Sequence, residues 1–171
     1  MARPRDGTVG TDWFDRPDPT GLTSTGEVGL RFECTMCGNC CTGAPGYVHF
    51  TADEAEAMAR ELGVTIAQFF ERYTHETPTG RSLQERETEH GFDCVLLDRE
   101  SVPGKALCRV YRARPSQCRT WPYWRDNARS LAAWKRAMET CPGMNRGPLT
   151  PPDVIRLTVS ASDDAGNPGR R

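Results

Sequence analysis

Segments with a helical period of apolar residues alternate with short apolar runs along the chain. The apolar run at residues 47–50 predicts a short strand, and the clearest predicted helix follows it. Thr51 and Glu54 form a capping-box pattern at the start of this helix, because each side chain can accept a hydrogen bond from the other residue's backbone N–H. Gly63 suits the left-handed conformation that often follows a helix. The apolar face of the predicted helix consists of Ala55, Met58, Ala59 and Leu62.

A second short helix and two strands are predicted next. Thr65 and Gln68 repeat the capping pattern, and apolar positions continue through Tyr73. Residues 81–89 alternate weakly, and residues 94–97 form a compact apolar run. Both segments are therefore expected to be strands.

The last third of the chain predicts two more helices. One begins near Asp126 and stops at residues 141–143, with Leu131, Trp134 and Met138 on its apolar face. The prolines of residues 150–153 suit the first turn of a final short helix. These elements together predict an α+β fold, built as a small, loop-rich single domain.

Both ends of the chain lack an apolar period. Residues 1–28 are rich in Gly, Pro, Thr and Asp, and residues 161–171 have a similar character. We therefore expect disordered N- and C-terminal tails around one cysteine-rich domain at residues 29–160.

Composition changes this picture, because the predicted domain has few core-forming residues. Leu, Ile, Val and Phe make up 27 of 171 residues, about 16%, below the ~20% that separates well-packed chains from disordered ones. The 22 basic and 23 acidic residues nearly cancel, which argues against the high net charge of a disordered chain. Eight cysteines are the candidate replacement for the missing core, so we expect a cysteine-ligated metal to stabilise the fold.

The expected compartment supports this interpretation of the cysteines. No apolar run is long enough to span a membrane, and no apolar segment follows the arginines of residues 1–10 as it would in a secretory signal. We therefore expect a cytoplasmic protein without a membrane partner, in which thiols stay reduced. Eight cysteines are then more typical of metal ligands than of disulfides, although a disulfide framework or free redox thiols is the alternative.

Four of the cysteines lie within eight residues, at Cys34, Cys37, Cys40 and Cys41. A C-x-x-C pair can place two sulfurs on one ion because a tight turn points both side chains inward, and Gly38 permits such a turn. Thiolates favour zinc, Cu(I) and iron–sulfur clusters over hard cations. The C-x-x-C-x-x-C part is similar to the run that binds a [4Fe–4S] cluster in bacterial ferredoxins. The predicted cofactor is an iron–sulfur cluster or zinc.

The adjacent pair adds a constraint on how the thiols group. In an extended backbone, neighbouring side chains point to opposite sides, so we expect Cys41 to turn away from the site of Cys40. Eight thiols suit two four-coordinate sites or one cluster with spare thiols, and both arrangements remain open at this point. The cysteines available to complete the ligand sets are Cys94, Cys108, Cys118 and Cys141.

These motifs resemble a known family, the CxxCxxCC cysteine-cluster proteins, also called YkgJ-like and described as a zinc- or iron-chelating domain. The run from Cys34 to Cys41 matches its defining motif, and residues 108–122 are similar to its C-x-x-Y-x-x-R-P-x-x-C-R-x-x-P signature. Residues 94–97 resemble its cysteine followed by apolar residues, and Cys141 fits a looser last cysteine. The resemblance covers about residues 30–145 and implies a metal-binding, iron–sulfur protein of bacterial type.

Charge is distributed unevenly around these motifs. Residues 51–90 carry a net charge of −5, whereas residues 99–136 carry +8. Four arginines lie near Cys108 and Cys118, and most of them are expected to form surface ion pairs with the first segment: Arg109, Arg112, Arg114 and Arg119. Arg114 and Arg119 flank Cys118 and are candidates to offset the negative charge of a thiolate-bound metal.

The histidines and the aromatic residues are weaker signals. His49, His75 and His90 can bind metals, but a surface or packing role is favoured for all three. Residues 121–124 place two Trp and one Tyr among arginines, a combination that also occurs on nucleic-acid-binding surfaces. Core packing is the favoured interpretation of these rings.

Three functions are consistent with the sequence. The first is a metal-binding cysteine-cluster protein, and the second adds a redox or accessory role for the cluster. The third is an Arg/Trp-rich module for a nucleic acid or a protein partner, with structural zinc. The sequence contains no phosphate-binding glycine loop and no nucleophile motif, so it predicts no independent catalytic activity.

Overall fold

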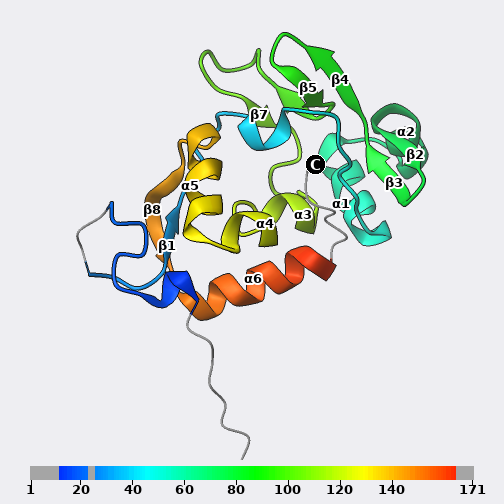
Figure 1. Cartoon of the computed structure of the whole chain (residues 1–171). Helices are drawn as coiled ribbons and strands as arrows, with labels where there is room; N and C mark the ends of the chain where they lie inside the picture. The colour runs from blue at the N-terminus through cyan, green and yellow to red at the C-terminus, as the bar shows by residue number, and fades with distance from the viewer. Residues whose placement is uncertain (1–11, 23–25, 165–171) are drawn as a thin grey trace, which may run out of the picture.

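The computed structural model describes residues 12–22 and 26–164 and consists of helices and small sheets (Figure 1). The strands described form two-stranded antiparallel sheets that pair β1 with β8, β2 with β3, β4 with β5 and β6 with β7. The expected α+β class is confirmed. In chain order the elements, with η for a 3-10 helix, are η1 (Trp13–Asp15), β1 (Leu30–Phe32), η2 (Asn39–Cys41), α1 (Ala52–Leu62), α2 (Ile66–Tyr73), β2 (Thr74–Thr77), β3 (Gly80–Leu83), β4 (Glu85–Thr88), β5 (Gly91–Cys94), β6 (Leu97–Asp98), β7 (Leu107–Cys108), α3 (Ser116–Arg119), α4 (Arg125–Ala128), α5 (Leu131–Thr140), β8 (Met144–Thr150) and α6 (Pro152–Asp164).

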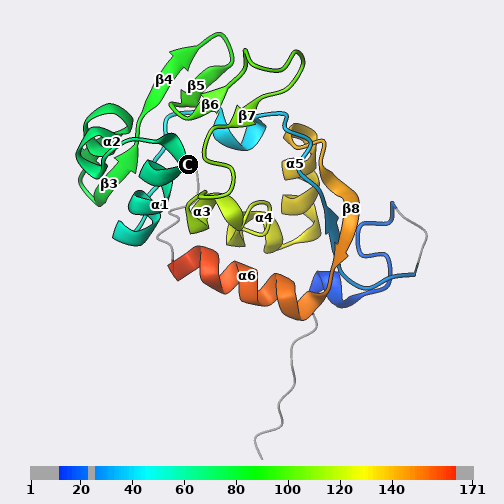
Figure 2. The ribbon, with the colours of Figure 1, turned by 180° about the vertical axis from the view of Figure 1, so that it is seen from behind.

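Two groups of buried side chains fill the interior. The first, the helical core, contains Phe14, Leu30, Tyr123, Trp134, Cys141, Met144 and Ile155. The second, the hairpin core, contains Ala55, Met58, Ala59, Phe69, Leu83, Leu96 and Val110. The segment around η2 lies between the elements of the two cores in both views (Figures 1 and 2). The cysteine run is therefore placed at the junction of two small cores.

The first two predicted helices are confirmed, together with their caps. Glu54 donates its backbone N–H to Thr51 Oγ1 at 3.2 Å, and Thr51 donates its own to Glu54 Oε2 at 3.0 Å. Thr65 and Gln68 make the same pair of bonds at the start of α2. Gly63 ends α1 with φ 68°, in the left-handed region. These ends form because local side chains satisfy backbone groups that the helix leaves unpaired.

The predicted strand at residues 81–89 is divided in the structure. Gln84 accepts a hydrogen bond from the backbone N–H of Val95 at 2.9 Å and donates its own N–H to Tyr73 at 2.8 Å. These long-range bonds turn the chain from the β2–β3 hairpin into the β4–β5 hairpin. The 47–50 run makes an isolated bridge, between His49 and Ser82. Residues 94–97 are likewise divided, between the end of β5 and the start of β6.

The helix predicted from Asp126 is also divided, into α4 and α5. Ser130 has extended backbone angles and its Oγ accepts a hydrogen bond from the N–H of Ala133 at 3.1 Å. This bond caps a new helix, so the apolar face of Leu131, Trp134 and Met138 belongs to α5 alone.

The N-terminal tail prediction is wrong for the described residues 12–22. Phe14 is 4% exposed within the helical core, and Trp13 Nε1 donates to the carbonyl of Ala128 at 2.6 Å. Arg156 of α6 forms ion pairs with Asp12 and Asp15. The segment is ordered because its two aromatic rings supply core area that the rest of the chain lacks. Residues 1–11 and 23–25 lie outside the described residues.

The C-terminal tail prediction is wrong for residues 161–164, because α6 continues to Asp164. Ile155 and Ser162 are fully buried, and Val159 packs against the helical core between them. Their spacing of four and three residues places all three on one helix face. Residues 165–171 lie outside the described residues. In the described part of the chain, every helix is too short or too polar to cross a bilayer.

We predict that Phe14→Ala lowers the free energy of unfolding by about 3–5 kcal/mol, the usual cost of truncating a buried phenylalanine. Leu22→Ala is the matched control, because Leu22 belongs to the same segment but is 57% exposed. Urea unfolding of both variants checks the prediction. Equal stability of the two variants would show that the segment does not contribute to the core.

Candidate metal centre

The cysteine run adopts a compact turn that places its thiols close together. Met36 and Gly38 have positive φ angles of 57° and 78°, and the backbone N–H of Cys41 donates to the carbonyl of Gly38 at 2.8 Å. The chain then continues through η2. A Cβ on Gly38 would lie 2.7 Å from Cβ of Ala106, so this position requires glycine for space as well as for conformation.

Backbone hydrogen bonds attach this turn to both cores. On one side, the N–H of Glu33 donates to the carbonyl of Gly143 at 3.1 Å, which draws the run toward Cys141. On the other side, the N–H of Ala106 donates to the carbonyl of Met36 at 2.8 Å, just before β7. Segments more than 60 residues apart in sequence are thereby brought to one place.

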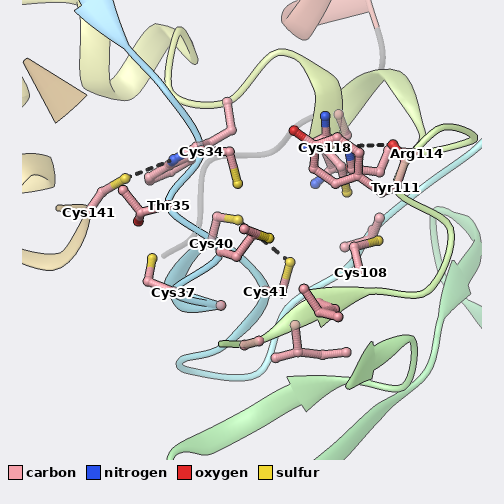
Figure 3. A pocket seen from close by; sticks show the side chains of 18 of the residues that line it. Cys34, Thr35, Cys37, Cys40, Cys41, Cys108, Tyr111, Arg114, Cys118 and Cys141 are labelled. Carbon is pink, nitrogen blue, oxygen red and sulfur yellow. Dashed lines mark hydrogen bonds between the residues drawn. The ribbon is translucent and has the colours of Figure 1, made fainter. Parts of the chain in front are cut away.

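A cavity of about 480 Å³ lies at this junction. Phe32, Leu97, Trp121 and Trp124 form apolar parts of its wall, and sulfur is its predominant metal-binding donor. Cys94 is not among the lining residues and lies in β5, opposite Glu85 of β4. Seven cysteines line the cavity, namely Cys34, Cys37, Cys40, Cys41, Cys108, Cys118 and Cys141 (Figure 3).

The expectation that Cys41 turns away from Cys40 is wrong. The two sulfurs are 3.6 Å apart, and both residues line the same cavity. The backbone of η2 is a 3-10 turn, not an extended strand. With three residues per turn, neighbouring side chains diverge by about 120° and can both face one space.

The remaining thiols surround the cavity without meeting at one point. Among the described residues, no three His, Cys, Asp or Glu side chains converge closely enough to hold a single metal ion. Soft sulfur donors are nevertheless the ligands that zinc, Cu(I) and iron–sulfur clusters favour. The donor set therefore fits a thiolate-bound metal, with its sulfurs spread over the cavity wall.

Desolvation keeps several of these thiols protonated. It raises the pKa of Cys94 to about 12, and it also raises the pKa values of Cys108, Cys118 and Cys141. Trp121 opposes this effect at Cys141, because its Nε1 donates to the Sγ at 3.5 Å. A metal that binds here must displace protons, so its affinity falls as the pH falls.

Of the two arginines predicted beside the metal, one lies at the cavity. Arg114 lines it and stacks on Tyr111, with 3.8 Å from its guanidinium carbon to the ring centroid. Its positive charge lowers the pKa values of Cys108 and Cys118, although desolvation outweighs this. Arg119 instead forms an ion pair with Glu54 of α1 at 3.3 Å. Arg119 is the one of the four arginines near this motif with an ion pair to residues 51–90 among the described residues, so the expectation that most of them form such pairs is wrong.

The sequence analysis missed an ionic group beside the cysteine turn. Asp93 is fully buried and receives two hydrogen bonds from Arg99, at 2.8 and 3.0 Å. Thr42 donates to Asp93 at 2.5 Å and accepts from Arg99 at 2.6 Å. The bonds to Asp93 raise the pKa of Arg99, and the charges of Cys41 and Cys37 raise it further. No spacing rule links these three residues, so only their position beside Cys94 and Cys41 could have drawn attention to them.

The histidines and the aromatic residues have the packing roles that were favoured. His49 bonds to the carbonyl of Arg81 and to Thr79 and does not line the cavity. Tyr123 and Trp124 are 7% and 8% exposed, and Trp121 packs against the helical core. The three aromatic rings of residues 121–124 therefore pack in the interior of the protein.

Comparison with known proteins supports a metal-binding role for this part of the chain. A family model named CxxCxxCC, with the description "putative zinc- or iron-chelating domain", matches residues 33–142, which is 110 of the 171 residues. The matched range contains all eight cysteines. No solved structure matches the chain.

We predict that iodoacetamide modifies Cys34 far faster than Cys94 in the folded, metal-free protein at pH 8. Cys34 is exposed, whereas a pKa of about 12 leaves Cys94 almost without the reactive thiolate. We expect a difference of at least ~100-fold, measured by mass spectrometry of the alkylated peptides. In 8 M urea, used as the control, the two rates should become similar, because unfolded thiols share a pKa of ~8.5. Comparable rates in the folded protein would contradict the raised pKa of Cys94.

Proposed function

This chain belongs to the CxxCxxCC family of zinc- or iron-chelating domains, and we propose that it is an iron–sulfur protein whose cluster is bound by cysteines at the cavity between the two cores. The observation that carries the proposal is the distribution of seven thiols around a single cavity. We assign all eight cysteines to the metal centre, seven from the cavity wall and Cys94 from β5, outside the lining.

The size of the cavity favours a cluster over a single ion. Its volume of about 480 Å³ falls in the range of ~300–1,000 Å³ that is usual for bound molecules. A lone zinc ion needs no such space, because four thiolates at ~2.3 Å fill its coordination shell. Space enclosed by thiols is better suited to several metal atoms.

The spread of the sulfurs favours the same choice. Around one tetrahedral zinc the sulfurs lie about 3.8 Å from one another, as follows from the ~2.3 Å Zn–S distance. Cys40 and Cys41 are that close, at 3.6 Å, but no third ligand joins them among the described residues. In a [4Fe–4S] cluster each thiolate binds a different iron atom, so the ligands are farther apart than around one zinc ion.

Electrostatic neighbours suggest how the ligands group. After desolvation, the charges of Cys94, Cys40 and Cys108 are the largest causes of the raised pKa of Cys118. Cys94 is influenced in turn by Cys108 and Cys40. Because Cys40, Cys108 and Cys118 also line the cavity, we assign these three to one group, with Cys94 next to it. Cys141 is influenced by Cys37 and Cys40 and belongs with the other side of the cavity.

The same arrangement would make the metal stabilise the fold. Cys141 is part of the helical core, whereas Cys94 and Cys108 pack against the hairpin core. A centre bound from both sides connects two cores that are small by themselves. Binding energy of a metal that the unfolded chain does not bind adds directly to folding stability.

A bound iron–sulfur cluster accepts and releases single electrons at a potential set by nearby charges, hydrogen bonds and solvent exposure. Trp121 and Trp124 make an edge-to-face contact at 4.9 Å and exclude water from one wall of the cavity. We therefore propose an electron-transfer or accessory redox role. The buried rings of residues 121–124 give no support to the nucleic-acid alternative.

We expect the full chain, purified without oxygen, to contain iron and acid-labile sulfide in equal amounts. It should have a visible absorbance that dithionite bleaches. Elemental analysis, sulfide determination and electron paramagnetic resonance of the reduced protein are the measurements. A colourless protein with stoichiometric zinc would replace the cluster by a structural zinc site.

We also predict that Cys37→Ser loses most of its metal and lowers the melting temperature, because one thiolate at the cysteine turn is missing. Met36→Leu changes the neighbouring residue of the same turn without removing a thiol and is the control. Metal content and thermal unfolding are measured without oxygen. Full metal content and an unchanged melting temperature in Cys37→Ser would remove Cys37 from the ligand set.

A further inference from the structure

The ionic group of Asp93, Arg99 and Thr42 lies against the outer side of the cysteine turn. Asp93 has no exposed surface, and the Arg99 side chain is 24% exposed. The carboxylate holds the guanidinium with two bonds, and the Thr42 hydroxyl, one residue after Cys41, adds a third. An arginine fixed by a buried bidentate pair has one orientation, unlike a surface arginine.

The guanidinium faces the turn at Gly38. A Cβ placed on this glycine would lie 3.2 Å from Nη1 and 3.4 Å from Nη2 of Arg99. Gly38 separates Cys37 from η2, which carries Cys40 and Cys41. The positive charge thus lies beside the turn that carries three of the thiols.

One nitrogen of Arg99 remains available to this turn. Nε and Nη2 carry the bonds to Asp93 and Thr42, and Nη1 makes no hydrogen bond within the described part of the chain. Nη1 is also the nitrogen nearest to Gly38. Asp93 is therefore bound on the Nε/Nη2 edge of the guanidinium, and Nη1 lies on the side nearer to Gly38.

We propose that Arg99 is a positioning residue that holds a fixed positive charge against the cysteine turn and thereby raises the reduction potential of the bound metal centre. This inference rests on the proposed iron–sulfur centre. Reduction adds a negative charge to the cluster, and a nearby cation stabilises the reduced form more than the oxidised form. Asp93 and Thr42 act through Arg99, because they determine where its guanidinium lies.

A purely structural role is the competing explanation, and charge separates the two. Arg99→Gln alone would leave a buried carboxylate without its partner, which destabilises the fold. The informative variant is therefore Asp93→Asn combined with Arg99→Gln, because it removes both charges together. Arg99→Lys keeps the positive charge but loses the planar guanidinium that makes two hydrogen bonds to Asp93. Thr42→Val keeps the ion pair but removes the two hydrogen bonds of the Thr42 hydroxyl, one to Asp93 and one from Arg99. Arg60→Gln, at an exposed site on α1, makes the same change in net charge as Arg99→Gln at a distance and is the control.

The experiment measures the midpoint potential of each anaerobically purified protein, together with its iron content and the urea stability of its metal-free form. In the double variant we expect the equilibrium constant for one-electron reduction of the cluster to fall about threefold. At ~59 mV per tenfold change, this is a midpoint potential lower by ~28 mV. Thr42→Val should shift in the same direction by a smaller amount. Arg99→Lys and Arg60→Gln should remain close to the wild-type potential.

Each outcome bears on a different claim. If the wild-type protein contains zinc and no reducible cluster, the proposed function fails, and the inference about Arg99 fails with it. If the cluster is present but the double variant and Thr42→Val keep the wild-type potential, the inference alone is overturned. An equal loss of potential in Arg99→Lys and in the double variant would also overturn it, because the retained charge would then have no effect. A loss of metal-free stability without a shift in potential would assign Arg99 a structural role.

Discussion

The junction between two small cores is the constraint on which the rest of this structure depends. Neither core is large: the helical core relies on aromatic rings from distant segments, including Phe14 near the N-terminus, and the hairpin core is built from α1, α2 and short hairpins. The cavity where they meet carries seven thiols among its apolar side chains. The proposed metal centre would connect both sides and so compensate for the low content of Leu, Ile, Val and Phe.

Thiols at such a junction need charge compensation once a metal has displaced their protons. Burial disfavours thiolates, as the pKa of about 12 at Cys94 indicates. The chain supplies positive charge in two ways. Arg114 lies at the cavity wall and is held by stacking on Tyr111, whereas Arg99 lies behind the cysteine turn and is held by a buried carboxylate. The second arrangement is the more rigid one, because two hydrogen bonds define the orientation of the guanidinium.

Local rules predicted the parts of the fold that depend on neighbouring residues. The caps at Thr51 and Thr65 involve bonds across three residues, so the sequence contains all the information they need. The break at Gln84 and the order of η1 depend on bonds and packing with segments far away in the chain. The hydrophobic period could predict neither feature. The segment of η1 is short and polar with two aromatic residues, so it has no repeat to detect, and the break at Gln84 depends on distant partners.

The sequence by itself determined the chemistry of the site: eight cysteines, their spacing in two dense motifs, and the soft metals that such ligands favour. The tertiary structure decided which thiols share a space. It placed Cys40 and Cys41 on the same cavity, because a 3-10 turn replaces the extended backbone assumed from adjacency. It also brought Arg99, held by Asp93, beside Gly38, a placement that no local spacing encodes. Ligand type is a property of residues, whereas ligand grouping and charge placement depend on long-range packing.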